Sequence, residues 1–173
     1  MRSLISSVLV LVVLGLAATT ASAATITGEI AFLGSTFAPV GGGLGTATGL
    51  TIDPALVGAG TGEFNSQVGS LANFSPLDFG APDGVLFTTT GGLSFTVTGL
   101  TVDVQDATSL DFTATGFYSL AGFDDTGGIF TWTGETLGGL FTYSATGAAV
   151  VPLPGALLLF GSALGFLGLR RTR

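Results

Sequence analysis

The sequence has 173 residues, of which 29 are glycine, and it contains no cysteine and no histidine. All 11 acidic residues lie between Arg2 and Arg170, a stretch without any Lys or Arg, so nothing there can neutralise phosphates and nucleic acid is excluded as a partner. The missing cysteines exclude disulfides and thiol chemistry, and the missing histidines remove the commonest general base and metal ligand.

The first 23 residues indicate a secretory signal peptide. Arg2 provides a positive charge, residues 4–16 form an apolar run, and Ala21 and Ala23 complete an A-x-A cleavage pattern. A retained N-terminal anchor is the alternative, but the run is shorter than the roughly 17 residues that a comfortable span requires. We therefore expect residues 24–148 to form the exported domain.

Alternating apolar and polar residues predict antiparallel strands in this domain. A period of two occurs in residues 25–32, 93–98, 100–105 and 110–114, and threonine fills many of the alternate positions. This composition is typical of a half-buried sheet. The residues expected to face the core are Ile26, Ile30, Phe32, Leu93, Phe95, Val97, Leu100, Val102, Val104, Leu110, Phe112, Ala114, Phe130, Trp132, Phe141 and Tyr143.

Glycine and aspartate predict the turns between these strands. Turns are expected at Gly91 and Gly92, Gly99, Gly116, residues 124–128, and Gly138 and Gly139. In the less regular part, residues 41–43 and 58–62 are predicted loops and residues 46–53 a strand. This spacing favours an all-β fold, an antiparallel β-sandwich of jelly-roll or meander type.

The domain lacks the residues of most catalytic sites. Without His, Cys or Lys it can form no Ser-His-Asp triad, Cys-His pair, Schiff-base lysine or usual zinc site. A glycosidase-type pair of carboxylates remains formally available, but no pair stands out in the sequence. We therefore expect no catalytic residues and no cofactor.

Calcium is the metal that the available ligands suit best. Asp103, Asp106 and Asp111 lie close in sequence, as do Asp124 and Asp125, and hard oxygen ligands at loops suit Ca²⁺. No Asp-x-Asp-x-Asp-Gly loop with a distal Glu accompanies them. The favoured interpretation places Asp103 and Asp111 on the outer face of strands and the other three at turns.

The aromatic residues allow two interpretations. Trp132, Tyr118 and Tyr143 are candidates for a sugar-stacking face, because their rings combine apolar faces with a polar group. The favoured interpretation is that Phe130, Trp132, Phe141 and Tyr143 pack in the core.

The last 23 residues have three parts in a fixed order. These parts are a proline motif (Val151, Pro152, Leu153 and Pro154), an apolar segment (residues 155–169) and a basic end (Arg170, Arg171 and Arg173). As a helix the apolar segment would be roughly 22 Å long, against a hydrocarbon core of roughly 30 Å. The arginines favour a cytoplasmic end and an outward-facing domain. Residues 146–149 are predicted to be a short linker, and residues 149–173 the C-terminal signal.

This arrangement resembles the sorting signal of the PEP-CTERM family, in its VPLPA-CTERM variant, with Gly155 where the variant typically has Ala. The resemblance covers about 23 residues. It implies recognition and processing by a membrane exosortase, in Gram-negative bacteria that make exopolysaccharide. Residues 122–132 and 141–145 also resemble the ending of the short cysteine-free β domains that precede this signal, a resemblance that carries no known active site.

These observations predict an exported, non-catalytic envelope protein that signal peptidase and the Sec translocon handle first. A single C-terminal transmembrane helix would hold the β domain on the periplasmic side of the inner membrane, and processing near residues 151–154 would deliver it to the surface or matrix. Exopolysaccharide is a candidate partner. One alternative is a permanently anchored periplasmic glycan-binding module, and another is a small calcium-dependent or carbohydrate-active enzyme.

Overall fold

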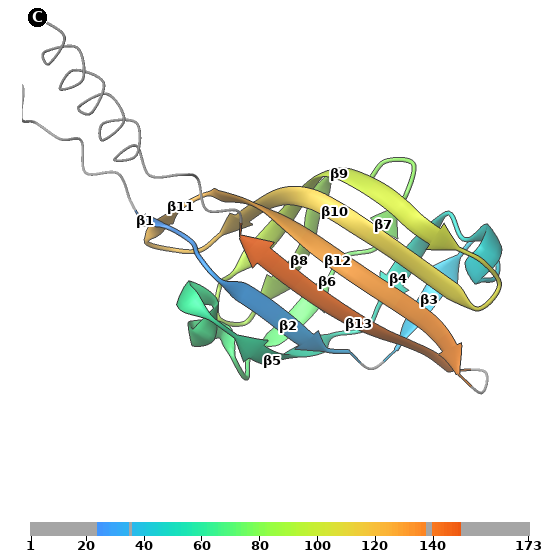
Figure 1. The fold of residues 1–173 in the computed structure, drawn as a ribbon, viewed down its shortest axis with the longest axis horizontal. Coiled ribbons are helices and arrows are strands. Elements are labelled where there is room, and N and C mark those ends of the chain that lie inside the picture. Colours follow the sequence, from blue (N-terminus) through green and yellow to red (C-terminus); the bar gives the residue numbers. More distant parts are fainter. Residues whose placement is uncertain (1–23, 35, 138–139, 150–173) are drawn as a thin grey trace, which may run out of the picture.

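Strands make up most of the part of the chain that the computed structural model describes, which comprises residues 24–34, 36–137 and 140–149 (Figure 1). The elements in chain order are β1 (Ala24–Thr25), β2 (Glu29–Leu33), β3 (Phe37–Val40), η1 (Leu44–Thr46), β4 (Gly49–Ile52), β5 (Ala55–Gly60), η2 (Gly62–Gln67), β6 (Leu71–Phe74), β7 (Leu77–Asp78), β8 (Gly84–Thr89), β9 (Ser94–Gln105), β10 (Ser109–Ser119), β11 (Phe123–Asp124), β12 (Thr126–Leu137) and β13 (Leu140–Ala149). The two η elements are single 3-10 helices.

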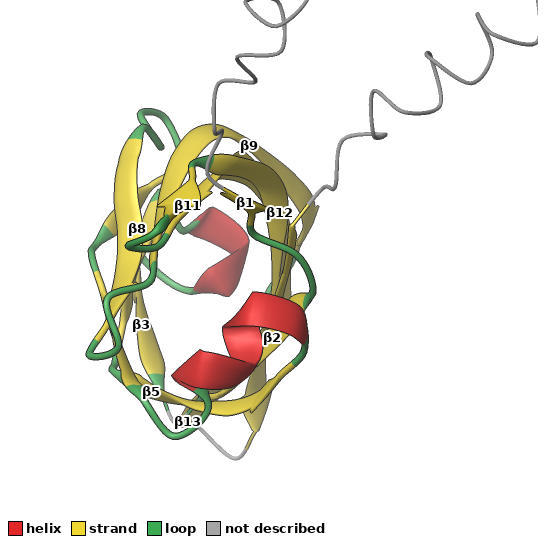
Figure 2. Cartoon of the chain, turned by 90° about the vertical axis from the view of Figure 1, so that its left-hand side faces the viewer, coloured by secondary structure: helices red, strands yellow, loops and turns green. Residues whose placement is uncertain are grey.

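Eight strands close into a barrel in the order β10-β12-β13-β2-β5-β6-β8-β9. All neighbours in the ring are antiparallel, and the view along the barrel shows the strands encircling the interior (Figure 2). The ring is completed where β13, the last strand, pairs with β2, with Gly147 opposite Ile30 and Ala148 opposite Glu29. Closure gives each of the eight strands a neighbour on both sides over part of its length, although β8 pairs with β9 only as far as Val97.

The predicted all-β antiparallel fold is confirmed, and the predicted sandwich is wrong. The register of β9 against β10 shifts between Asp111 and Phe112 and again between Thr115 and Gly116. Such irregularities bend and twist a strand, which lets one sheet curl into a ring in place of two facing sheets. The first shift also reverses the expected alternation, so Val104 is exposed although the sequence predicts it to face the core.

Phenylalanine rings fill the middle of the barrel. Phe32, Phe87, Phe95 and Phe130 are all buried. Phe87 lies with its ring centroid 5.0 Å from that of Phe32, 5.8 Å from Phe130 and 6.1 Å from Phe95. The interior is therefore a packed core, as in small barrels whose side chains meet at the axis.

The two ends of the barrel are covered differently. At one end η2 inserts Phe64, whose ring lies 5.0 Å from that of Tyr118, and the short parallel pair β1–β11 lies nearby (Figures 1 and 2). At the other end lie η1 and the three-stranded sheet β3-β4-β7, where Phe37 packs edge-on against Trp132 at 4.6 Å. Gln105 fastens η1 by donating to the carbonyl oxygens of Leu44 at 3.0 Å and of Ala47 at 2.8 Å.

Several glycines predicted to be turns lie inside strands. Gly91 and Gly92 do form a turn, whereas Gly99 and Gly116 lie within β9 and β10. Gly128 lies within β12, where an added Cβ would be 2.4 Å from Cε2 of Tyr118. The absence of a side chain at this position leaves room for the ring, which is a packing role that sequence periodicity does not reveal.

Three other segment boundaries differ from expectation. The predicted strand at 46–53 is confined to β4, and the predicted loop at 58–62 begins within β5. Residues 146–149, predicted to be a linker, are the last four residues of β13. The last barrel strand therefore continues to the residue directly before Val150.

Among the described residues, no helix has the length and apolar character needed to cross a membrane. The predicted signal peptide at 1–23, sorting motif at 151–154, helix at 155–169 and basic end at 170–173 lie outside the described residues.

Candidate functional site

Most predicted site residues lie beyond the ends of the described barrel. They are Ala21 and Ala23 of the cleavage pattern, Val151, Pro152, Leu153 and Pro154 of the motif, and Arg170, Arg171 and Arg173 of the basic end. The structure nevertheless shows where the segments that carry them join the barrel.

Both junctions lie at the η2 end of the barrel. Ala24, the predicted first residue of the exported domain, pairs with Phe123 in the parallel β1–β11 bridge. Ala149 pairs with Gly128, and its N–H donates to the carbonyl oxygen of Gly28 at 3.1 Å. The two junctions therefore share one end of the molecule, while η1 lies at the opposite end (Figure 1).

A carboxylate ties this end together. Glu63 of η2 accepts hydrogen bonds from the hydroxyl of Thr27 at 2.5 Å and from its N–H at 2.6 Å, and its own N–H donates to the Thr27 carbonyl at 3.2 Å. The side-chain hydrogen bond from Thr27, followed by the backbone hydrogen bond, lowers the pKa of Glu63. The loop of Thr27 and Gly28 is thus fastened to η2.

Gly28 allows the close approach on which this arrangement depends. Its φ is +108°, a conformation that L side chains rarely adopt, and a Cβ there would lie 2.2 Å from the carbonyl oxygen of Thr61. A glycine is therefore required where the loop passes η2.

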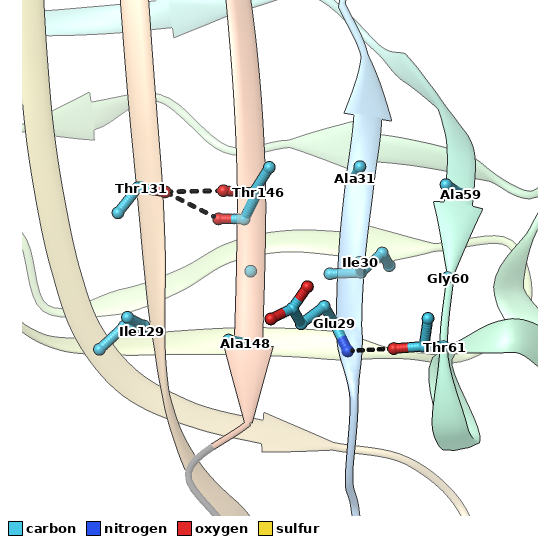
Figure 3. A pocket seen from close by; sticks show the side chains of 11 residues that line it. Glu29, Ile30, Ala31, Ala59, Gly60, Thr61, Ile129, Thr131, Thr146 and Ala148 are labelled. Carbon is cyan, nitrogen blue, oxygen red and sulfur yellow. Dashed lines mark hydrogen bonds between the residues drawn. The ribbon is translucent and has the colours of Figure 1, made fainter.

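The barrel wall carries a shallow groove of about 280 Å³ across β12, β13, β2 and β5 (Figure 3). Ala31, Ala59 and Ala148 line it, and their small side chains leave the wall hollow. Ala31 and Ala59 face each other directly on neighbouring strands. The groove therefore arises mainly where short side chains occupy the outer face of these strands, and Ile30 of the core also lines it.

Hydroxyl groups border this groove. Thr131 on β12 is opposite Thr146 on β13, and their Oγ1 atoms lie 2.8 Å apart (Figure 3). Thr61 and Glu29 complete the polar border, and the Thr61 hydroxyl accepts a hydrogen bond from the N–H of Glu29 at 2.9 Å. Ile129 adds an apolar side chain. Among the described residues that line the groove, Glu29 is the only charged one. These groups can accept and donate hydrogen bonds but cannot neutralise an anion.

The aspartates considered as calcium ligands are engaged separately. Asp106 begins the β9–β10 turn, as predicted, by accepting from the N–H and hydroxyl of Thr108 at 2.7 and 2.8 Å and from the N–H of Ser109 at 2.8 Å, which lowers its pKa. Asp103 accepts from the hydroxyl of Thr113 at 2.8 Å.

The remaining three aspartates have separate positions. Asp125 accepts from the hydroxyl of Ser119 at 2.5 Å, and Asp111 lies on strand β10 as predicted. Asp124 is predicted to begin a turn but belongs to strand β11. Within the described residues, no three or more acidic, histidine or cysteine side chains gather in a group that could hold a metal ion. The structure therefore gives the calcium interpretation no assembled site.

Two of the three proposed sugar-stacking rings are in the core. Trp132 is 1% exposed and Tyr118 is 0% exposed, so neither presents a face to a ligand. This corrects the sugar-stacking interpretation and confirms the core interpretation for Phe130 and Trp132. The side chains of Phe141 and Tyr143 lie outside the described set.

No protein-family model matches the sequence, and neither a curated protein nor a solved structure matches it. The sequence does not reveal the groove, because its threonines and alanines come from strands that are about a hundred positions apart and carry no motif. The outward positions of the alternating pattern were the single available signal.

Proposed function

We propose that this chain is a non-catalytic exported protein whose barrel is delivered to the cell surface or extracellular matrix by a C-terminal sorting signal. The observation that carries the proposal is the tripartite end of the sequence, with its proline motif, apolar segment and arginines. The position of both junctions at the η2 end supports it. A barrel tethered at one end leaves its walls and its η1 end free to contact other molecules.

In this proposal the leader is removed by signal peptidase after Sec-dependent export. The helix at 155–169 then holds the domain in the inner membrane of a Gram-negative cell, with the barrel in the periplasm. A membrane exosortase recognises residues 151–154, and the processed barrel joins the envelope or an exopolysaccharide matrix.

Deletion of residues 151–173 tests the sorting step in cells of the natural host. The truncated chain should be exported but fail to reach the surface or matrix fraction. A matched variant that replaces residues 151–154 with alanine, and keeps the apolar segment, should remain in the inner membrane. Unchanged surface delivery of both variants would contradict the proposal.

The groove favours a second candidate function, the binding of an uncharged glycan. The groove offers hydroxyl and carboxylate groups to sugar hydroxyls, from Thr131, Thr146, Thr61 and Glu29. Ile129 adds an apolar contact. The four strands that carry the groove are paired with one another in sequence, so a peptide cannot bind there by strand addition. The lack of any basic residue between Arg2 and Arg170 disfavours an anionic polymer. A permanently anchored glycan-binding module is the form of this alternative that needs no processing.

Affinity electrophoresis through a neutral glucan gel tests the groove. Ala148→Trp should fill the groove and abolish any retardation, and Thr131→Val should weaken it. Thr133→Val is the matched control, because Thr133 is exposed on the same strand but does not line the groove. Equal mobility of all variants with and without glucan would exclude this function.

The mass of the mature protein separates the two anchoring schemes, because an intact Arg173 indicates a permanent anchor.

A further inference from the structure

The last barrel strand leads directly into the predicted sorting motif. Ala149 is still part of β13, opposite Gly128 and hydrogen-bonded to Gly28. Val150 alone separates it from Val151. Two residues span at most about 7 Å, so the motif must begin within that distance of the barrel.

The residue that holds Ala149 is itself held by η2. Ala149 donates to the carbonyl of Gly28, the neighbouring Thr27 donates twice to Glu63, and Phe64, next to Glu63, is 0% exposed in the core. A continuous series of contacts therefore runs from the core through Glu63 to the residue that precedes the motif by two positions.

We propose that the η2 end of the barrel, meaning η2, the loop of Thr27 and Gly28 and the end of β13, is the surface that meets the membrane enzyme which processes residues 151–154. The hydrogen bonds of Thr27 to Glu63 and of Ala149 to Gly28 hold the end of β13 in place and so limit how far the motif extends into that enzyme. This inference rests on the proposed function, because it requires that the motif is processed.

The physical reason is the absence of a spacer. An enzyme that binds the motif in an extended conformation must contact the barrel end or wait for the end of β13 to detach. Strand ends open more readily than the whole domain unfolds, so the rate of processing should follow this local opening. Loosening the end of β13, or moving it away from the motif, should accelerate processing.

Pulse-chase labelling of full-length protein in cells of the natural host tests the inference, with the processed fraction followed by mass. Insertion of Gly-Ser-Gly-Ser between Ala149 and Val150 should accelerate processing several-fold while leaving the barrel sequence intact. Glu63→Gln should accelerate it to a smaller extent, because Thr27 loses a charged acceptor. Combining Glu63→Gln with the insertion should add nothing to the insertion alone.

Asp106→Asn is the matched control, because Asp106 is a carboxylate in a similar hydrogen-bonded turn near η1, away from the motif. It should leave the rate unchanged, which separates the positioning effect from a general loss of stability. Equal rates for the wild type, the insertion and Glu63→Gln would overturn the inference and leave the proposed function standing. Absence of a processed product in every variant, wild type included, would overturn both.

Discussion

The hydroxyl of Tyr118 occupies the space that a side chain at position 147 would need. A Cβ placed on Gly147 would lie 2.0 Å from Oη of Tyr118, and that hydroxyl donates to the carbonyl oxygen of Ile129 at 2.9 Å. Burial raises the pKa of Tyr118, which favours the protonated phenol that donates this hydrogen bond. The last strand and the core of the barrel are therefore fitted to each other at this pair.

Replacement of Gly147 by alanine should destabilise the barrel by about 1–3 kcal/mol, because overpacking forces the ring or the strand to move. Gly128 restricts the ring from another side, so rotation offers little relief. The free energy of unfolding in urea measures the effect. Gly127→Ala is the control, since an added Cβ there meets no atom within 4 Å. If both variants lost the same stability, the fit between Tyr118 and Gly147 would be unimportant.

The fluorescence of Trp132 should report whether the η1 end of the barrel is tightly packed. It is the only tryptophan, it is 1% exposed, and it stacks on Phe112 at 5.1 Å. We expect blue-shifted fluorescence that acrylamide quenches weakly, with a red shift on unfolding. Phe37→Ala should cost about 3–5 kcal/mol and expose the indole to quencher, because Phe37 covers it from β3. Val40→Ala is the control, because Val40 is exposed on the same strand, and it should change neither the stability nor the quenching. Strong quenching in the wild type would contradict the burial of the indole.

Acid should weaken the barrel through Glu63 and Asp106. Hydrogen bonds to the charged carboxylates lower the pKa of Glu63 below 4.5 and that of Asp106 below 3.8. A lowered pKa in the folded state means that the unfolded state binds more protons. The contribution is therefore complete above the unfolded-state pKa and is lost as the pH falls through the folded-state pKa.

Urea unfolding between about pH 5 and pH 2 measures this dependence. The combined variant Glu63→Gln and Asp106→Asn should show a flatter decline in the free energy of unfolding. Glu135→Gln is a control at an exposed carboxylate. An unchanged slope in the combined variant would show that these two hydrogen-bonded carboxylates do not govern acid stability.

Thr89 should be more important for stability than any exposed threonine. Its buried hydroxyl donates to Oε1 of Gln67 at 2.7 Å and accepts from the N–H of Leu93 at 3.0 Å, which joins η2 to the β8–β9 turn. Thr89→Val leaves both partners unsatisfied and should cost about 1–3 kcal/mol. Thr98→Val, at an exposed site, should remain within about 0.5 kcal/mol of wild type. Thermal unfolding of the two variants provides the comparison, and equal shifts would contradict the role of Thr89.

The alternating pattern identified most of the core correctly. Phe95, Val97, Leu110, Phe112 and Phe130 are all buried, because a strand places alternate side chains on opposite faces in any sheet. The pattern failed at Val104, since a register shift between neighbouring strands leaves no trace in one strand's own sequence.

The glycines also show that one strand's sequence does not reveal where its neighbouring strands lie. Gly91 and Gly92 form the turn that their sequence predicts, whereas Gly116 lies in mid-strand, where a Cβ would be 1.9 Å from the carbonyl oxygen of Thr96. Local conformational freedom and close packing both select glycine. Only the position of the neighbouring strand distinguishes them.

The sequence by itself determined the class of the fold, the faces of most strands, the acidic and cysteine-free character of the domain and the absence of usual catalytic groups. These properties follow from local periodicity and from the presence or absence of side chains. Tertiary structure alone decided that the sheet closes, that β2 pairs with β13, and that residues 146–149 belong to the barrel. Closure depends on pairing between residues more than a hundred positions apart, and on the shape of a filled core, neither of which a local pattern encodes.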